Sequence, residues 1–220
     1  MADSPHHTPV VRLTHWLTTI AFLFLLATGI EIILPHPRLY WGEYGNVNTT
    51  PLFQLPIPSS RAIVHTGYNY VLRDENGWGR ALHFQSAWLL LFAAAIYILS
   101  GKFRRLMPGA ADLAALPASL RSHLRFEPLD RSYNPLQKFS YAVVVFLLFP
   151  FIIWTGLAMS PTFAAFAPSA VSILGGQQSA RTIHFFLTIF LFVFLIVHVA
   201  MLFFAGFRTR MRSMLTGDKT

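Results

Sequence analysis

Four long apolar runs constrain the fold of this chain more than any other feature. Each run holds about the twenty residues that a helix needs to cross a bilayer core, which predicts a membrane protein. The composition agrees, because 54% of the residues are hydrophobic and 12% are charged, about half the charged share of a soluble domain. The predicted spans are residues 13–34, 82–101, 139–160 and 183–206.

The segments between these runs share Lys and Arg unequally. Seven lie in 102–138, four in the C-terminal tail, and Arg12 precedes the first run, so twelve fall on one side and five on the other. Because basic residues are retained on the cytoplasmic side, both termini and the 102–138 loop are predicted to be cytoplasmic. We therefore expect an all-α, integral membrane four-helix bundle, formed as a single domain over residues 1–220.

Charge and cysteine content exclude several classes of function. The net charge of +8 does not indicate a nucleic-acid partner, because topology accounts for most of the basic excess. The chain has no cysteine, which excludes disulfides, iron–sulfur ligation and covalent haem attachment. A haem in this chain would be non-covalent, with His or Met as its ligands.

Two histidines, His184 and His198, lie fourteen residues apart within the fourth run. In a helix this spacing is about 3.9 turns, so both rings lie near one face and roughly 21 Å apart along the axis. One ring therefore belongs to each half of a bilayer core of roughly 30 Å. A titratable ring in lipid is costly without a partner, so this spacing predicts two stacked metal or cofactor sites.

His15 and His83, near the edges of the first two spans, are the predicted partners of these rings. With the N-terminus inside, the first span runs outward and the second and fourth run inward. His15 therefore joins His198 on the cytoplasmic side. His83 joins His184 on the outer side. No carboxylate or thiol accompanies these rings, which favours haem over zinc or copper, with two axial imidazoles for each iron.

An Arg precedes the His by three residues in three similar segments: 12-RLTHW-16, 80-RALHF-84 and 181-RTIHF-185. Residues three apart share a helix face, so each Arg lies one turn nearer to water than its His. We expect Arg12, Arg80 and Arg181 to face haem propionates; the alternative is that they only extend from the membrane edge to water. Gly29 and Gly156, each in a Thr-Gly pair, are candidates to line a porphyrin, with ordinary close helix packing as the alternative.

The outer loop, residues 35–81, is long and rich in turn formers and aromatics. Its aromatic residues favour a membrane-interface position, with docking of an external partner as the alternative. The loop histidines are not expected to be ligands; His65, in 61-RAIVH-65, is the one that could approach the outer haem. Glu31, near the outer end of the first span, is expected to be interfacial, with proton handling as the alternative.

These segments resemble the bacterial cytochrome b561-like membrane cytochromes, which include the b-type subunits of nickel–iron hydrogenases, formate dehydrogenases and thiosulfate-reductase-like enzymes. The resemblance covers residues 10–215. The stretch 37-PRLYWGEYGN-46 is similar to the thiosulfate-reductase-type branch, often found with a periplasmic molybdopterin oxidoreductase. The matching elements are 12-RLTHW-16, 80-RALHF-84, 175-GGQQSARTIHFF-186 and the fourteen-residue step from His184 to His198.

The resemblance implies a multi-pass protein of the bacterial inner (cytoplasmic) membrane with two non-covalent b haems. His15 and His198 would hold the inner haem, and His83 and His184 the outer one. The chain would be the electron-transfer subunit of an oxidoreductase complex, linking quinone, an exchangeable substrate, to a periplasmic oxidoreductase subunit. We would seek the quinone near Arg12 and the inner ends of the first and fourth spans. A homodimer is left open.

Two other functions are compatible with the sequence. Some small relatives in this family oxidise superoxide and reduce quinone without a partner, and an arginine-lined outer mouth would steer such an anion. The second alternative is a haem-free membrane anchor or small transporter, whose histidines serve proton relay or helix–helix hydrogen bonds. Haem content and superoxide consumption by the purified chain separate these readings. The arginines of the outer mouth are Arg38, Arg61, Arg73, Arg80 and Arg181.

Overall fold

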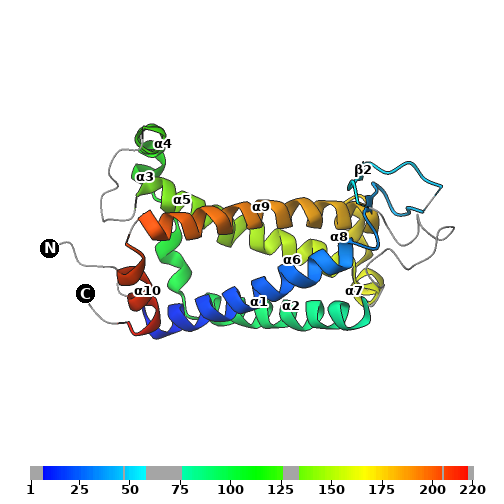
Figure 1. The fold of residues 1–220 in the computed structure, drawn as a ribbon, viewed down its shortest axis with the longest axis horizontal. Coiled ribbons are helices and arrows are strands. Elements are labelled where there is room, and N and C mark those ends of the chain that lie inside the picture. The colour runs from blue at the N-terminus through cyan, green and yellow to red at the C-terminus, as the bar shows by residue number, and fades with distance from the viewer. Residues whose placement is uncertain (1–6, 47, 58–75, 126–133, 205, 218–220) are drawn as a thin grey trace. The chain divides into compact units, whose positions relative to one another are not determined.

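Long apolar helices dominate the computed structural model, which describes residues 7–46, 48–57, 76–125, 134–204 and 206–217 (Figure 1). Within these ranges, four helical stretches are long and apolar enough to cross a membrane. The predicted all-α architecture with four membrane helices is confirmed, while the cytoplasmic placement of the termini stays a prediction. The four stretches are α1 (Pro9–Ile33), α2 (Asn76–Leu99), the third stretch (Pro135–Ala158) and α9 (Gln177–Phe204).

The helices begin earlier than the predicted spans. The difference is four residues at the first span (13 against Pro9) and six at the fourth (183 against Gln177). Hydropathy marks only the apolar part of a helix, whereas the polar first turns, which include each Arg-x-x-His segment, are also helical. The candidate site residues of these segments therefore lie inside regular helix and not at frayed ends.

The third stretch changes its helix type next to Pro150. It consists of α5 (Pro135–Val143), a π-helical turn, η4 (Val144–Leu148), and α6 (Phe149–Ala158). Proline has no N–H and cannot bond the carbonyl four residues earlier, so a regular helix would be interrupted there. The π-helical turn ends two residues before Pro150, so the change of helix type lies where the proline interrupts the regular bonding.

The chain separates into two compact units, and each of the four membrane stretches contributes to both. The first unit comprises residues 1–18, 91–150 and 190–220; the second comprises residues 19–90 and 151–189. The expectation of a single domain stays a prediction.

In the first unit, short helices follow the second and fourth membrane stretches. They are η3 (Lys102–Leu106), α3 (Ala110–Ala114), α4 (Leu116–Leu124) and α10 (Phe207–Leu215), and α3 and α4 pack on α5. Lys138 of α5 donates to the Asp112 carboxylate over 2.5 Å, and the Gly109 N–H donates to the same oxygen over 2.7 Å. The Lys138 hydrogen bond, followed by that of Gly109, holds the pKa of Asp112 below its ordinary value.

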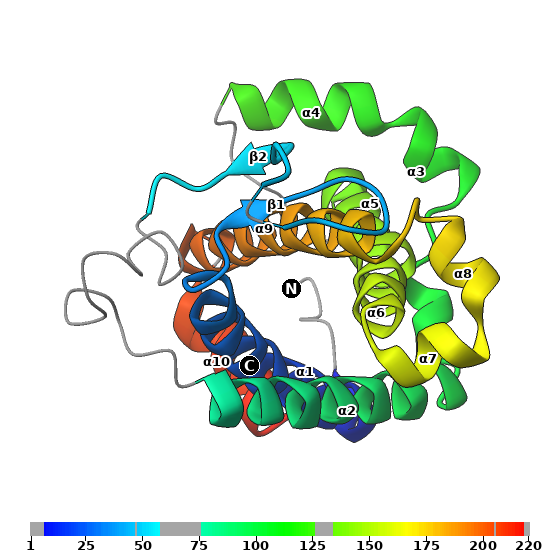
Figure 2. The same cartoon turned by 90° about the vertical axis from the view of Figure 1, so that its right-hand side faces the viewer.

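The second unit adds a short hairpin and two small helices. Strands β1 (Arg38–Leu39) and β2 (Phe53–Gln54) pair antiparallel, with Leu39 opposite Phe53. Figure 2 shows α7 (Pro161–Phe166) and α8 (Pro168–Ser172) following directly on α6. The Trp154 indole donates to the Ala170 carbonyl over 3.2 Å and ties α8 back to α6. The core of this region consists of Ala158, Val171, Leu174 and Ala180.

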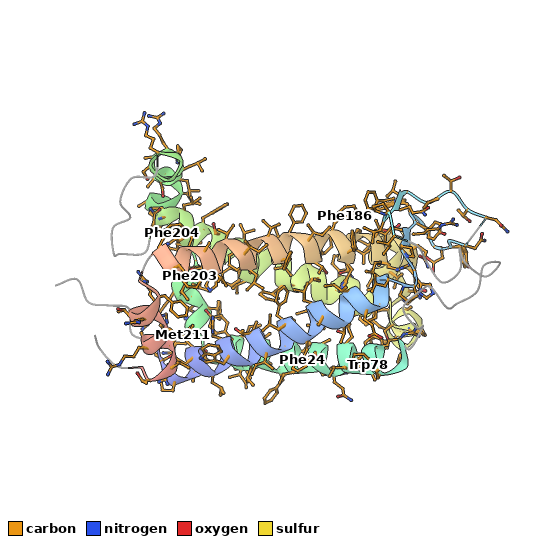
Figure 3. The ribbon with its side chains drawn as sticks, in the orientation of Figure 1. Phe24, Trp78, Phe186, Phe203, Phe204 and Met211 are labelled. Atoms are coloured by element: carbon orange, nitrogen blue, oxygen red, sulfur yellow. The ribbon has the colours of Figure 1, made fainter. Side chains whose placement is uncertain are left out.

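Large apolar side chains cover the outside of the long helices (Figure 3). Phe24 and Trp78 of the second unit are exposed, as are Phe203 and Phe204 of the first. Phe204 is 84% exposed at the end of α9. So much exposed apolar surface would be a liability in water, but it is what a lipid-facing surface requires.

Candidate functional site

The second unit brings together His83 of α2 and His184 of α9. Their ring centroids lie 6.4 Å apart, and the ring planes are inclined by 61°. Each ring also approaches a threonine hydroxyl on a neighbouring helix. Thr28 Oγ1 of α1 lies 2.9 Å from His83 Nδ1, and Thr155 Oγ1 of α6 lies 3.0 Å from His184 Nδ1.

A glycine follows each of these threonines and lies against the same ring. A Cβ atom on Gly29 would lie 3.7 Å from His83 Cε1, and one on Gly156 would lie 3.4 Å from His184 Cε1. The missing side chains therefore let the helix backbone approach the imidazoles closely. Both Thr-Gly pairs border a histidine, which is a more specific role than close packing between helices.

The first unit brings together His15 of α1 and His198 of α9. Their centroids are also 6.4 Å apart, with a 46° angle between the ring planes. The described contacts of this pair are aromatic. Phe194 stacks on His198 at 5.7 Å, and Tyr141 meets it edge-on at 5.9 Å. Trp16 lies edge-on to His15 at 5.4 Å.

The spacing of the rings in both pairs is compatible with a metal ion between two imidazoles. Metal–nitrogen bonds of about 2 Å on opposite sides of one ion separate two ring centroids by roughly 6 Å. The spacing of 6.4 Å in both pairs is close to this distance. Among the described residues, no cluster of three or more His, Cys, Asp or Glu side chains forms a metal site. Two-ligand sites of this kind suit a haem, whose porphyrin supplies the other four donors.

Arg12 contacts α10 of the same unit. Its Nε donates to the Met214 carbonyl over 3.2 Å, and its terminal nitrogens donate to Thr216, over 3.0 Å, and to Leu215. A cation at the carbonyl end of a helix is favourable, so Arg12 caps α10. Its pairing with a propionate and its place near a quinone stay predictions.

Arg181 and Arg80 differ in their surroundings. Arg181 donates to the carbonyls of Arg38, over 3.3 Å, and His36, over 2.5 Å. Arg80 is exposed on the first turns of α2. Their pairing with propionates also stays a prediction, and for Arg181 a structural contact to the outer loop is already in place.

The outer loop is attached to the first turn of α9 through Gly42. The Gly42 N–H donates to Ser179 Oγ over 2.7 Å, and the Gly42 carbonyl accepts from the N–H groups of Gln178 and Ser179. The Thr182 hydroxyl donates to the Tyr40 carbonyl over 2.6 Å. The Gly42 carbonyl satisfies N–H groups that a helix start otherwise leaves open, and the Thr182 bond holds the loop two residues from His184.

Gly176 makes this attachment possible. Its φ of +105° lies in the left-handed region, and a Cβ atom there would lie 2.7 Å from the Gly42 backbone. A side chain would therefore be strained and would overlap the loop. Of the loop aromatics expected at the membrane interface, Tyr40 is buried, whereas Trp41 and Tyr44 are exposed.

Glu31 lies against the first turn of α2, where Gly79 has no side chain to exclude the carboxylate. Its Oε2 atom is buried and has no hydrogen-bond partner among the residues that the structure describes.

His65, Arg61 and Arg73, which the sequence placed near the outer site, lie outside the described residues.

Taken together, four membrane helices with two facing histidine pairs define a membrane-embedded cytochrome of the b type. The comparison with family models agrees: residues 6–217 match the prokaryotic cytochrome b561 family, and the chain belongs to it. It is therefore a multi-pass membrane electron-transfer protein, and membership implies haem b binding.

A curated relative is similar over most of its length. The protein of Azospira oryzae provisionally named protein-methionine-sulfoxide reductase subunit YedZ1 is 29% identical over 210 residues, which cover 89% of this chain and 88% of the relative. No solved structure matches the chain.

Sequence reasoning missed the two threonine hydroxyls and the Gly42 attachment. In the sequence, the Thr-Gly pairs indicate a role for their glycines, and only the structure assigns each threonine to a ring. Ser179 and Thr182 carry no separate sequence signal, although polar residues on both sides of Arg181 in an apolar chain are a weak indication of buried hydrogen bonds.

Proposed function

We propose that this chain carries electrons between a membrane quinone pool and an oxidoreductase partner at the outer face. Two b haems would serve this transfer, one at each histidine pair. The observation that supports the proposal most directly is the matching 6.4 Å ring spacing of both pairs. When bound, a haem held by the two histidines of a pair would supply one-electron oxidation and reduction.

The chain's own residues would orient and shield these groups. His15 and His198 would hold one haem among Trp16, Phe194 and Tyr141. His83 and His184 would hold the other beside the Thr-Gly pairs. All four rings are half-buried, and the apolar side chains around them would limit the access of water to both sites.

The partner would be an oxidoreductase subunit. The name of the Azospira oryzae relative supports a reductase that acts on methionine sulfoxide in proteins. The molybdopterin-type partner expected from the sequence is a compatible and broader description. The loop attached to α9 through Gly42 presents exposed Trp41 and Tyr44 in the unit that holds His83 and His184, which makes it the candidate contact surface.

The membrane placement follows from the charge distribution. We place the His15–His198 pair on the cytoplasmic side of the bacterial inner membrane and the His83–His184 pair on the outer side. Cysteine labelling tests this orientation: a membrane-impermeant maleimide should label Tyr44→Cys in intact cells and should label Thr209→Cys only after lysis.

Quinol-driven turnover tests the function. Proteoliposomes with the full chain would be supplied with a quinol and a soluble methionine-sulfoxide reductase, and the loss of sulfoxide would be followed. We expect the reaction to need the chain and to fall more than about tenfold in His184→Ala, because one axial ligand is removed. His36→Ala, outside the predicted pairs, is the matched control. Turnover by His184→Ala at the wild-type rate would contradict the proposal.

Superoxide consumption by the purified chain distinguishes an electron-transfer subunit from a stand-alone oxidoreductase. If the purified chain alone consumed superoxide and reduced quinone at a rate comparable with partner-driven turnover, the chain would be a stand-alone oxidoreductase. Arg181 donates to two loop carbonyls and keeps its positive charge, so it would still contribute to steering an anion in that case.

A further inference from the structure

In the second unit, Thr28 and Thr155 each donate their hydroxyl proton to a backbone carbonyl. Thr28 Oγ1 lies 2.6 Å from the Phe24 carbonyl, and Thr155 Oγ1 lies 2.9 Å from the Ile152 carbonyl. A carbonyl only accepts, so each hydroxyl must donate to it; otherwise two oxygens with lone pairs would face each other at these distances. Both side chains are buried, with 3% exposure for Thr28 and 0% for Thr155.

Because each hydroxyl proton is donated to a carbonyl, the direction of the hydrogen bond between each threonine and its histidine ring is fixed. A hydroxyl has one proton, so an oxygen that donates to a carbonyl can only accept from a second partner. His83 Nδ1 at 2.9 Å and His184 Nδ1 at 3.0 Å must therefore carry the proton and donate it. The Nε2 atom of each neutral ring is then left with its lone pair, which is the form that binds a metal.

We propose that Thr28 and Thr155 are positioning residues for the outer haem: they fix both ligands in the Nδ1–H form, fix the ring orientations and lower the haem's reduction potential. The inference rests on the proposed function. A ligand that donates its N–H to an acceptor is a stronger electron donor to its metal, which favours the oxidised ion. The described contacts of the His15–His198 pair are aromatic, so we expect the reduction potentials of the two haems to be set by different contacts.

Potentiometric titration of the purified full chain tests the proposal. Thr28→Val and Thr155→Val keep the shape of the side chain and remove the acceptor oxygen. We expect the midpoint potential of one haem to rise in each variant and to rise further in the double variant, with the other haem unchanged. The ferric low-spin electron paramagnetic resonance signal of the same haem should shift as its rings become free to turn.

Matched controls separate positioning from a general packing effect. Thr188→Val removes a hydroxyl that donates to the His184 carbonyl, and Thr14→Val removes one that donates to the Val10 carbonyl. Neither change should move a potential. Thr28→Ser and Thr155→Ser keep the hydroxyl and should restore the wild-type potential and spectrum. Unchanged potentials in both valine variants, or equal shifts in the Thr188 control, would overturn the proposal.

A haem-independent readout distinguishes this proposal from the proposed function. Nitrogen-15 chemical shifts of the labelled histidines in the haem-free chain report which ring nitrogen carries the proton. We expect Nδ1–H at His83 and His184 in the wild type, and a mixture of forms when the facing threonine is valine. An Nε2–H form in the wild type would overturn the assignment. A chain that shows Nδ1–H at both rings but binds no haem would instead refute the proposed function, and with it the effect on potential, while the assignment of the ring protons would stand.

Discussion

At the scale of single residues, the proposed function makes the haem content depend on individual histidines. His184→Ala is expected to lower the haem content from two per chain to one and to leave the spectrum of the His15–His198 haem intact. His198→Ala should do the converse. Pyridine haemochrome quantification gives the content, and His36→Ala serves as control. A variant that retains both haems with native spectra would show that the altered histidine is not a ligand.

A single hydroxyl also anchors the outer loop. Thr182→Val keeps the volume of a side chain that is 2% exposed but leaves the Tyr40 carbonyl without its 2.6 Å hydrogen bond. Leaving a buried acceptor unpaired costs about 1–3 kcal/mol, so the loop should open more readily. Limited proteolysis should cleave around residues 40–46 faster than in the wild type. Equal cleavage rates in Thr182→Val and the wild type would refute this role.

At the scale of elements, the start of α9 depends on a glycine. Gly176→Ala forces a side chain into a left-handed conformation, at a cost of about 1–2 kcal/mol, and against the Gly42 backbone. We expect a clear fall in Tm together with weaker attachment of the loop. Gly77→Ala is the matched control, because a Cβ at this position meets nothing within 4 Å. Equal Tm values for the two variants would contradict the role of Gly176.

The attachment of α3 to α5 should depend on pH in acid. Lys138 holds the pKa of Asp112 below its ordinary value, so the folded chain favours the ionised carboxylate. That contribution is fully present above the pKa of the unfolded chain, about 4, and is lost as pH falls through the lower pKa of the folded chain. Asp112→Asn should therefore lower Tm slightly at pH 7 and not at all in strong acid. A difference that widens as pH falls would contradict the assignment.

The elements also show what could be predicted from the sequence. Run length and composition were enough for the four membrane helices, because a bilayer imposes both. The fourteen-residue step and the charge bias predicted which histidines share a level, and the ring centroids of both predicted pairs lie 6.4 Å apart. The helix starts were predicted too late in the chain, because hydropathy detects the apolar part of a helix and not its polar first turns. The Thr28 and Thr155 contacts were missed because they depend on how neighbouring helices pack.

At the scale of the whole molecule, haem is expected to be part of the stability of the fold. A ligand that binds only the folded chain adds its binding free energy to the free energy of unfolding. Chain produced under haem limitation should therefore unfold at a lower temperature, and added haem should restore Tm. His184→Ala should show an intermediate value. A haem-free chain with the Tm of the loaded protein would show that the sites form without contribution from the cofactor.

The central claim, one b haem at each histidine pair, is tested most directly by a reduced-minus-oxidised visible spectrum of the purified chain with haem quantified per chain. The account predicts two b haems per chain, both six-coordinate and low-spin, because each pair supplies two axial imidazoles. One haem per chain would show that one of the two histidine pairs does not hold a haem. A colourless chain would contradict the account as a whole.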